Sequence, residues 1–178
     1  MHKDLKSILL TEEEIFEIVS KVANRINEDY AGEEVHILVI LKGSMTFAAD
    51  LIRKIKVPVT LDFMQASSYH SGTKSTGDIK IRLDLAESIE GKNVIIVEDI
   101  VDSGNTLFAL KNILKQRDPK SLKICAMLDK PSRREAEIEV EYTGAEIPDE
   151  FVVGYGLDYA EHYRELPYIG VLGEWMYS

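Results

Sequence analysis

The chain has 178 residues, of which 45% are hydrophobic and 29% are charged, and its formal net charge is −10. This length suits one domain with a full hydrophobic core, and the negative charge argues against binding along a nucleic-acid backbone. No apolar run approaches the roughly 18 residues of a membrane helix, the first residues lack a signal-peptide pattern, and the single cysteine, Cys125, excludes a disulfide framework. We therefore expect a cytoplasmic protein that binds neither membranes nor nucleic acid.

The first predicted elements are a helix, a buried strand and a second helix. Thr11 followed by Glu14 forms a capping box, which predicts a helix start. The apolar face of this helix comprises Ile15, Ile18, Val19, Val22, Ile26 and Tyr30. Residues 35–41 have the pattern of a strand buried on both faces, and the turn 42–44 follows them. The next helix has an inward face of Phe47, Ala48, Leu51, Ile52 and Ile55.

A polar stretch interrupts the next two predicted strands. Residues 57–63 and 79–85 each have a strand pattern, whereas 67–78 are polar and have no apolar periodicity. A polar stretch of this length inside a compact domain is typical of a functional lid or of a disordered segment.

The most informative stretch runs from Val94 to Leu107. Its β-branched residues 94–97 predict a strand buried in a parallel sheet, and we expect this strand to end at two carboxylates, Glu98 and Asp99. A polar loop, 102–106, follows, and then a helix with Leu107, Leu110, Ile113 and Leu114 on one face. Ligands of open α/β sheets bind where such loops leave the strands.

The loop 102–106, with the sequence DSGNT, has the composition of a phosphate site. Unpaired N–H groups at the start of a helix attract an anion, the hydroxyls of Ser103 and Thr106 can donate hydrogen bonds, and Gly104 allows close approach. The two carboxylates before it can accept hydrogen bonds from vicinal hydroxyls or face a divalent cation. A phosphate beside a diol is the chemistry of a ribose 5-phosphate. The turn taken alone would indicate only a helix cap, but the whole constellation favours a binding site.

The remaining segments complete an α/β pattern. A buried strand is predicted over 121–128, an edge strand over 138–142, and a break at Pro148. The succession of buried strands and amphipathic helices predicts a mostly parallel central sheet flanked by helices on both faces.

The acidic pair and the DSGNT loop resemble the phosphoribosyl pyrophosphate motif of the type I phosphoribosyltransferases. Over residues 5–172 the chain is similar to the members that use the 6-oxopurines hypoxanthine and guanine, with further matches in STGDIK at 75–80 and in FVVGYGLDY from Phe151. The resemblance implies a single domain, 1–178, with a small hood over the carboxyl edge of the sheet, built from the N-terminal strand and parts of the C-terminal third. It implies a purine salvage enzyme that uses Mg²⁺ and transfers 5-phosphoribosyl from phosphoribosyl pyrophosphate to N9 of hypoxanthine or guanine, giving IMP or GMP plus pyrophosphate.

The resemblance also implies a role for each matched residue. Asp102 would be the general base. The residues that hold the ribose and its 5′-phosphate would be Glu98, Asp99, Asp102, Ser103, Gly104, Asn105 and Thr106. The pyrophosphate would be bound by Lys42, Gly43 and Arg164, with a non-proline cis peptide between Lys42 and Gly43. The purine would be bound by Lys130, Phe151 and Val152. The mobile loop would include Ser68 and Tyr69, and the residues facing Mg²⁺ would be Glu98, Asp99 and Asp158.

Two other classes of function were considered. An RNA-binding regulator with the same fold is disfavoured by the net charge and by the purine matches at Lys130 and Phe151. A dinucleotide-binding module is disfavoured because the turn lacks the GxGxxG fingerprint. The sequence leaves open the preference among hypoxanthine, guanine and xanthine, the kinetic order, and the choice between a homodimer and a homotetramer. It also leaves open the effect of Gln65 and Ser67, which stand where the animal enzymes carry basic residues.

Overall fold

The computed structural model describes residues 1–68 and 79–177. Its central sheet consists of β2 (Val35–Ile40), β3 (Val59–Ser68), β4 (Ile79–Leu83), β5 (Asn93–Val101), β6 (Ser121–Asp129) and β7 (Tyr142–Glu146). The spatial order is β4-β3-β2-β5-β6-β7. The neighbouring strands β3, β2, β5, β6 and β7 are parallel to one another, and only the edge strand β4 is antiparallel to its neighbour, β3. The predicted mostly parallel sheet is confirmed.

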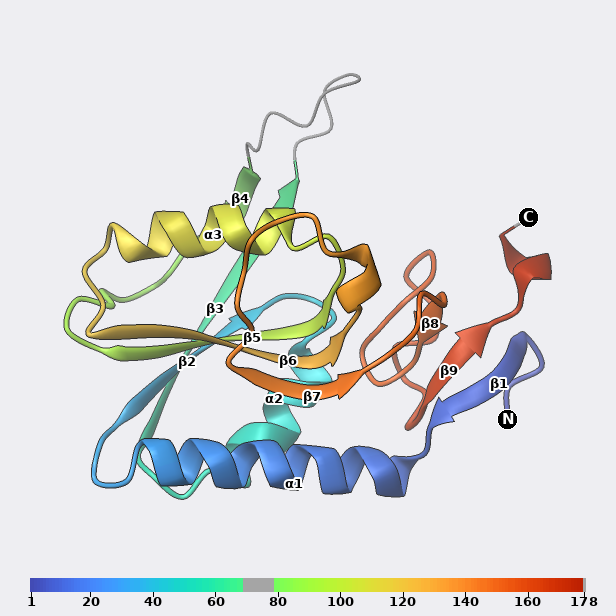
Figure 1. Cartoon of the computed structure of the whole chain (residues 1–178), viewed down its shortest axis with the longest axis horizontal. Helices are drawn as coiled ribbons and strands as arrows, with labels where there is room; N and C mark the ends of the chain where they lie inside the picture. The colour runs from blue at the N-terminus through green and yellow to red at the C-terminus, as the bar shows by residue number, and fades with distance from the viewer. Residues whose placement is uncertain (69–78, 178) are drawn as a thin grey trace.

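Helices cover both faces of this sheet, as predicted (Figure 1). The helices α1 (Glu12–Asp29) and α2 (Met45–Ile52) pack on one face, and α3 (Asn105–Lys115) packs on the other. The predicted capping box of α1 is present, since Thr11 Oγ1 accepts from the Glu14 N–H at 3.2 Å and the Thr11 N–H donates to Glu14 Oε2 at 2.8 Å. Along β2, β5 and β6, successive apolar side chains point alternately to one helical layer and to the other. The sheet is therefore buried on both faces.

A smaller antiparallel sheet lies beside the carboxyl ends of the parallel strands (Figure 1). It consists of β1 (Leu5–Leu10), β9 (Ile169–Leu172) and β8 (Val152–Val153), in the order β1-β9-β8. Two short 3₁₀ helices also occur: η1 (Pro131–Arg133) follows β6, and η2 (Glu174–Met176) follows β9. The first strand of the chain therefore pairs with β9, in its C-terminal third.

Three local predictions were wrong. The central strand does not end before the acidic pair, because its ladder with β6 continues from Glu98 through to Val101. The last strand of the large sheet starts at Tyr142 rather than at residue 138, since only residues from Tyr142 onward pair with β6, whereas Ile138 and Val140 pack against the core without pairing. The cis peptide bond joins Leu41 to Lys42, one residue before the predicted position. Neither residue of that bond is proline, so the residue types did not locate it.

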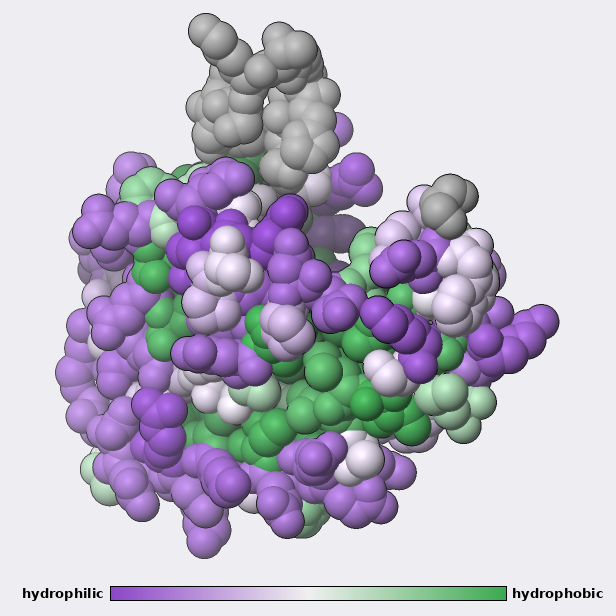
Figure 2. Space-filling model, turned by 45° about the vertical axis from the view of Figure 1, so that its right-hand side comes forward, coloured by the Kyte–Doolittle hydropathy of each residue, from purple (hydrophilic) through white to green (hydrophobic). Residues whose placement is uncertain are grey.

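The outer surface is mixed in character. Figure 2 shows hydrophilic side chains over much of one face and a band of hydrophobic surface crossing its lower half. Within the described residues, no helix combines the length and the apolarity needed to cross a membrane.

A buried histidine leads us to expect that acid destabilises the fold. His36 on β2 is 3% exposed, its Nδ1 lies 2.9 Å from Thr60 Oγ1, and its Nε2 has no hydrogen-bond partner among the described residues. Burial lowers the pKa of His36 below its usual value, and the positive charge of Lys92 lowers it further, whereas Asp62 and Glu34 act in the opposite direction. The folded state therefore binds this proton less readily than the unfolded state.

We expect His36→Gln to reduce the loss of stability on acidification. Because the folded-state pKa is depressed, the contribution of His36 is fully present above the unfolded pKa of about 6.5 and is lost as the pH falls below it. Urea unfolding at pH 7.5 and at pH 5 should show a smaller difference in free energy for the variant than for the parent chain. The exposed His162 provides the control, and an equal effect of His162→Gln would contradict the explanation.

Candidate active site

Two adjoining cavities lie at the carboxyl ends of the central strands. The first, called here the central cavity, has a volume of about 500 Å³ and is lined by Asp99, Ile100, Asp102, Lys130, Arg133, Asp149, Glu150, Phe151, Val152, Leu157 and Asp158. The second, called the loop cavity, has a volume of about 160 Å³ and is lined by Glu98, Ile100, Val101, Asp102, Ser103, Gly104, Thr106 and Leu107. Asp102 lines both, so the two cavities form one continuous site.

The acidic pair lies on β5 between these cavities. Both side chains are half-buried, and the Ile100 N–H donates to Asp99 Oδ1 at 2.7 Å. Burial raises the pKa of Glu98 well above its usual value, and the neighbouring charge of Asp99 raises it further. Burial likewise raises the pKa of Asp99 to about 6, although Arg164 counteracts this effect. Two crowded carboxylates of this kind are stabilised by a bound cation or by hydroxyl donors.

The loop 102–106 forms the start of α3. Gly104 is the N-cap residue of α3 and has a φ of 78°, a left-handed conformation that glycine adopts without strain. The Ser103 carbonyl oxygen accepts from the N–H groups of Glu135 and Ala136, each at 3.0 Å, so the segment after η1 holds the loop in place. The first N–H groups of α3 have no acceptor within the helix, which makes this cavity suited to an anion.

Lys130 and Phe151 lie on the wall of the central cavity. Lys130 is only 7% exposed, and its Nζ lies 3.3 Å from Asp102 Oδ1. Phe151 is 40% exposed; its ring stacks on Tyr177 with 5.4 Å between centroids and meets Tyr159 edge-on at 5.6 Å. Tyr177 follows directly after η2, the helix that contains Trp175. A flat apolar ring beside a buried ammonium group suits a planar base with a polar edge.

Val152, the third predicted purine residue, begins β8 beside Phe151. It is 6% exposed and lines the central cavity, and its backbone pairs with Val171 of β9. All three predicted purine-binding residues therefore line one cavity.

The residues predicted to bind pyrophosphate, Lys42, Gly43 and Arg164, line neither the central nor the loop cavity. Arg164 Nη2 lies 2.9 Å from Asp158 Oδ1, and Arg164 Nη1 donates to the Gly156 carbonyl at 2.8 Å. Lys42 Nζ lies 2.8 Å from Glu161 Oε2, and the other oxygen of Glu161 lies 3.4 Å from Arg164 Nη2. Lys42 lowers the pKa of Glu161. One carboxylate thus contacts both cations, which shows that an oxyanion fits between them.

Three backbone segments pack against one another without room for a side chain. A methyl group on Gly43 would overlap the Asp99 carboxylate, and a methyl group on Gly156 would overlap the Gly43 carbonyl oxygen. The turn after β2, the acidic pair and the loop before Asp158 are therefore held at contact distance. The lack of a side chain at position 43 is what allows Asp99 to occupy its position.

Gly43→Ala should lower kcat/KM by about 10²-fold or more, because the methyl group forces the Asp99 carboxylate aside and displacements of about 1 Å at an active site can cost that much. The thermal midpoint should change much less, since a side chain rather than backbone has to move. Gly32→Ala is the control for activity, because no atom lies within 4 Å of its added methyl, so its backbone strain at a φ of 80° affects stability without displacing Asp99. An equal loss of activity in both variants would contradict the overlap with Asp99.

The described residues include no group of three or more His, Cys, Asp or Glu side chains that could hold a metal ion. Asp99 and Asp158 nevertheless line the central cavity together, while Glu98 lines the adjacent loop cavity. Mg²⁺ is commonly held by one or two carboxylates together with substrate phosphates and water, and needs no all-protein cage. The donor set therefore fits Mg²⁺ that arrives with a phosphorylated substrate.

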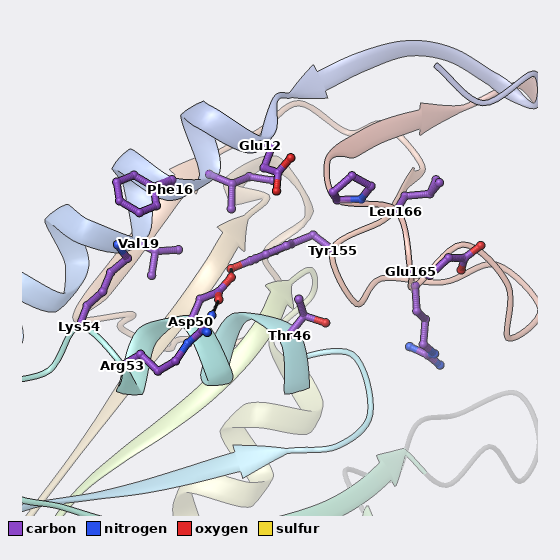
Figure 3. A pocket seen from close by; sticks show the side chains of 13 residues that line it. Glu12, Phe16, Val19, Thr46, Asp50, Arg53, Lys54, Tyr155, Glu165 and Leu166 are labelled. Carbon is purple, nitrogen blue, oxygen red and sulfur yellow. Dashed lines mark hydrogen bonds and ion pairs between the residues drawn. The ribbon is translucent and has the colours of Figure 1, made fainter.

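A third cavity, of about 630 Å³, lies between α1, α2 and the C-terminal segment. Figure 3 shows Tyr155 reaching toward Asp50 of α2, to which its hydroxyl donates at 2.7 Å. Of the predicted site residues, only Arg164 lines this cavity. The predicted carboxylates and purine residues, together with Ser103, Gly104 and Thr106, line the central and loop cavities instead, whereas Lys42, Gly43 and Asn105 line none of the three.

The sequence interpretation missed several residues of the central cavity. Asp149 and Arg133 line its wall, and Asp149 Oδ1 lies 3.8 Å from Lys130 Nζ. The position of Asp149 shortly before Phe151 was the only available signal. Of the predicted loop pair, Ser68 ends β3 and Tyr69 lies outside the described residues, as does the rest of the predicted lid to residue 78.

Comparisons with known proteins agree on one family. The family model of the phosphoribosyl transferase domain matches residues 6–160. The chain is 53% identical to a hypoxanthine-guanine phosphoribosyltransferase of Staphylococcus epidermidis over 178 residues, covering 100% of this chain and 99% of that relative. It is similar to the crystal structure of a hypoxanthine phosphoribosyltransferase from Staphylococcus aureus, with a TM-score of 0.96, 52% identity, and coverage of 100% and 97%. A hypoxanthine phosphoribosyl transferase of Trypanosoma cruzi is 42% identical, with a TM-score of 0.95 and coverage of 99% and 96%.

Proposed function

Because this chain belongs to the phosphoribosyl transferase domain family, we propose that the two adjoining cavities carry out a purine salvage reaction. The chain is a transferase that moves 5-phosphoribosyl from phosphoribosyl pyrophosphate to N9 of hypoxanthine or guanine, giving IMP or GMP and pyrophosphate. The observation that carries this function is the arrangement of Lys130, Phe151 and Asp102 around one cavity that continues into the loop at the start of α3.

In this proposal the loop cavity holds the sugar. The N–H groups and hydroxyls of residues Ser103, Gly104, Asn105 and Thr106 bind the 5′-phosphate, while Glu98 and Asp99 accept hydrogen bonds from the ribose hydroxyls. Fixing the phosphate and the hydroxyls places the anomeric carbon at the boundary with the central cavity. Cleavage there develops oxocarbenium character on the sugar, as in glycoside cleavage.

The pyrophosphate leaves toward the two cations Lys42 and Arg164. Lys42, the backbone of Gly43, and Arg164 bind it, which is supported by the way the Glu161 carboxylate bridges the two cations. Asp99 and Asp158, with Glu98 beside them, would hold Mg²⁺, which supplies positive charge to the leaving group when it is bound. Pyrophosphate replaces the Glu161 carboxylate as the anionic partner of Lys42 and Arg164.

The base binds in the central cavity. Phe151 stacks on the purine, Lys130 donates to the 6-oxygen, and the main chain of Val152 bonds the edge of the ring. Asp102 accepts a hydrogen bond from N7 and acts as the general base as N9 attacks the anomeric carbon. Orientation of N9 against the sugar provides much of the rate enhancement.

We extend the proposal to the organisation of the protein. The whole chain forms one phosphoribosyltransferase domain in which the sheet of β1, β9 and β8 acts as a hood over the site. The protein works in the cytoplasm on small-molecule substrates and assembles as a homodimer or homotetramer. The hydrophobic band in Figure 2 supports assembly, because exposed apolar areas on folded proteins mark interaction sites.

A radiolabelled-base assay tests the function. The chain is mixed with Mg²⁺, phosphoribosyl pyrophosphate and one of five bases: hypoxanthine, guanine, xanthine, adenine or uracil. We expect labelled nucleotide and pyrophosphate with hypoxanthine, with guanine or with both, and little product with adenine or uracil. Absence of nucleotide with both hypoxanthine and guanine would overturn the proposal, and omission of Mg²⁺ tests the metal requirement in the same assay.

A further inference from the structure

Lys130 lies between two carboxylates rather than beside one. Its Nζ lies 3.3 Å from Asp102 Oδ1 and 3.8 Å from Asp149 Oδ1, and both carboxylate side chains are about half exposed. Lys130 itself is 7% exposed, so its charge depends on partners inside the cavity. Asp102 has a role in the proposed reaction, whereas Asp149 has none in it.

The backbone fixes Asp149 at the wall of the central cavity. The loop from β7 to β8 is tied to the end of β6 by the Ile147 N–H, which donates to the Asp129 carbonyl at 2.8 Å. At the same end of β6, the Lys130 N–H donates to the Val101 carbonyl at 2.9 Å. The second oxygen of Asp149 lies 3.6 Å from Arg133 Nη1. Asp149 therefore bridges Lys130 to a second cation.

This geometry resolves a conflict in the proposed reaction. Asp102 must face purine N7 while Lys130 donates to the 6-oxygen, yet in the structure the two side chains pair with each other. This ion pair has to loosen when a base enters. The buried Lys130 ammonium then needs a second carboxylate to balance its charge. Asp149 is on the same cavity wall and already within ion-pair distance.

We propose that Asp149 is a positioning residue for base recognition: it draws the Lys130 ammonium away from Asp102 and holds it toward the 6-oxygen of the purine. The inference rests on the proposed function and adds a residue to its base site. Without Asp149, Lys130 pairs with Asp102 alone, and every incoming 6-oxopurine has to compete with that contact.

The test is a double-mutant cycle on the full chain. Asp149→Asn should raise KM for hypoxanthine and for guanine about two- to fivefold, the range of a part-exposed ion pair, and should leave KM for phosphoribosyl pyrophosphate unchanged. In the Lys130→Ala background the same substitution should change neither KM, because its target is absent. Asp149→Glu, which keeps the carboxylate, should restore most of the base affinity.

Glu150→Gln is the matched control. Glu150 lines the same cavity and carries the same charge, but within the described part of the chain its carboxylate has no ion pair with Lys130. An equal rise in KM for Glu150→Gln would show a general charge effect and overturn the proposal. So would an effect of Asp149→Asn that persists in the Lys130→Ala background. Failure of the unsubstituted chain to transfer any 6-oxopurine would instead overturn the proposed function itself.

Discussion

Asp102→Asn should lower kcat by about 10²–10⁴-fold, the usual contribution of a general acid–base group, while the affinity for phosphoribosyl pyrophosphate stays nearly unchanged. Asp102 lines both cavities, so its carboxylate can reach a base in one while its backbone belongs to the loop that we propose binds the sugar phosphate. The Asp102 carbonyl also accepts from Arg134 Nε at 3.3 Å, a contact that the substitution retains. The loop should therefore keep its shape when the carboxylate is lost.

Steady-state kinetics and calorimetric binding of phosphoribosyl pyrophosphate measure the two effects separately. Asp102→Ala should be run beside Asp102→Asn, because an amide can still accept a hydrogen bond from N7. Turnover at the parent rate in both variants would show that Asp102 does not act as the general base. A large loss of phosphoribosyl pyrophosphate binding would indicate that the residue holds the sugar rather than the proton.

The second large effect is expected at Lys130. A hydrogen bond from a charged donor contributes roughly 1.5–3 kcal/mol, so Lys130→Ala should lower kcat/KM for hypoxanthine and guanine by about ten- to a hundredfold. KM for phosphoribosyl pyrophosphate should scarcely change. Discrimination against adenine should weaken, because adenine presents an amino donor where the 6-oxopurines present an acceptor, and a charged lysine can only donate.

Competition assays with hypoxanthine, guanine and adenine measure this discrimination directly. Both carboxylates near Lys130 are about half exposed and can be hydrated after its removal, so we expect the variant to fold. Lys56→Ala provides a control, since Lys56 is exposed and lies before β3, at the amino ends of the parallel strands. An unchanged kcat/KM of Lys130→Ala with both hypoxanthine and guanine would show that other residues recognise the base.

The sequence predicted the regular elements well where apolar periodicity and caps determine them. The capping box at Thr11 and the apolar face of α1 are both present as predicted. The errors arose where a neighbouring strand decides the outcome. The polar types of Glu98 and Asp99 suggested a strand end, but pairing with β6 carries β5 on to Val101. Backbone hydrogen bonds across a sheet depend on register, which residue types alone do not specify.

The candidate site could be predicted where its residues follow one another along the chain. The loop 102–106 is contiguous, and its capacity for an anion follows from its own composition. Asp149 was missed because its importance arises from its contact with Lys130, which belongs to a different strand end. The contact of Gly43 with Asp99 was missed for the same reason, since it joins the ends of two neighbouring strands.

The aromatic stack at the end of the chain offers a spectroscopic handle on the base site. Tyr177 stacks on Phe151, and directly before it η2 carries Trp175, the only tryptophan in the sequence and 61% exposed. We expect purine binding at Phe151 to alter the emission of this indole, because Tyr177, which stacks on Phe151, lies two residues after Trp175. Intrinsic fluorescence excited at the tryptophan band therefore arises from a single position, two residues before the tyrosine that stacks on Phe151. Titrations and rapid-mixing experiments can follow that emission without an attached dye.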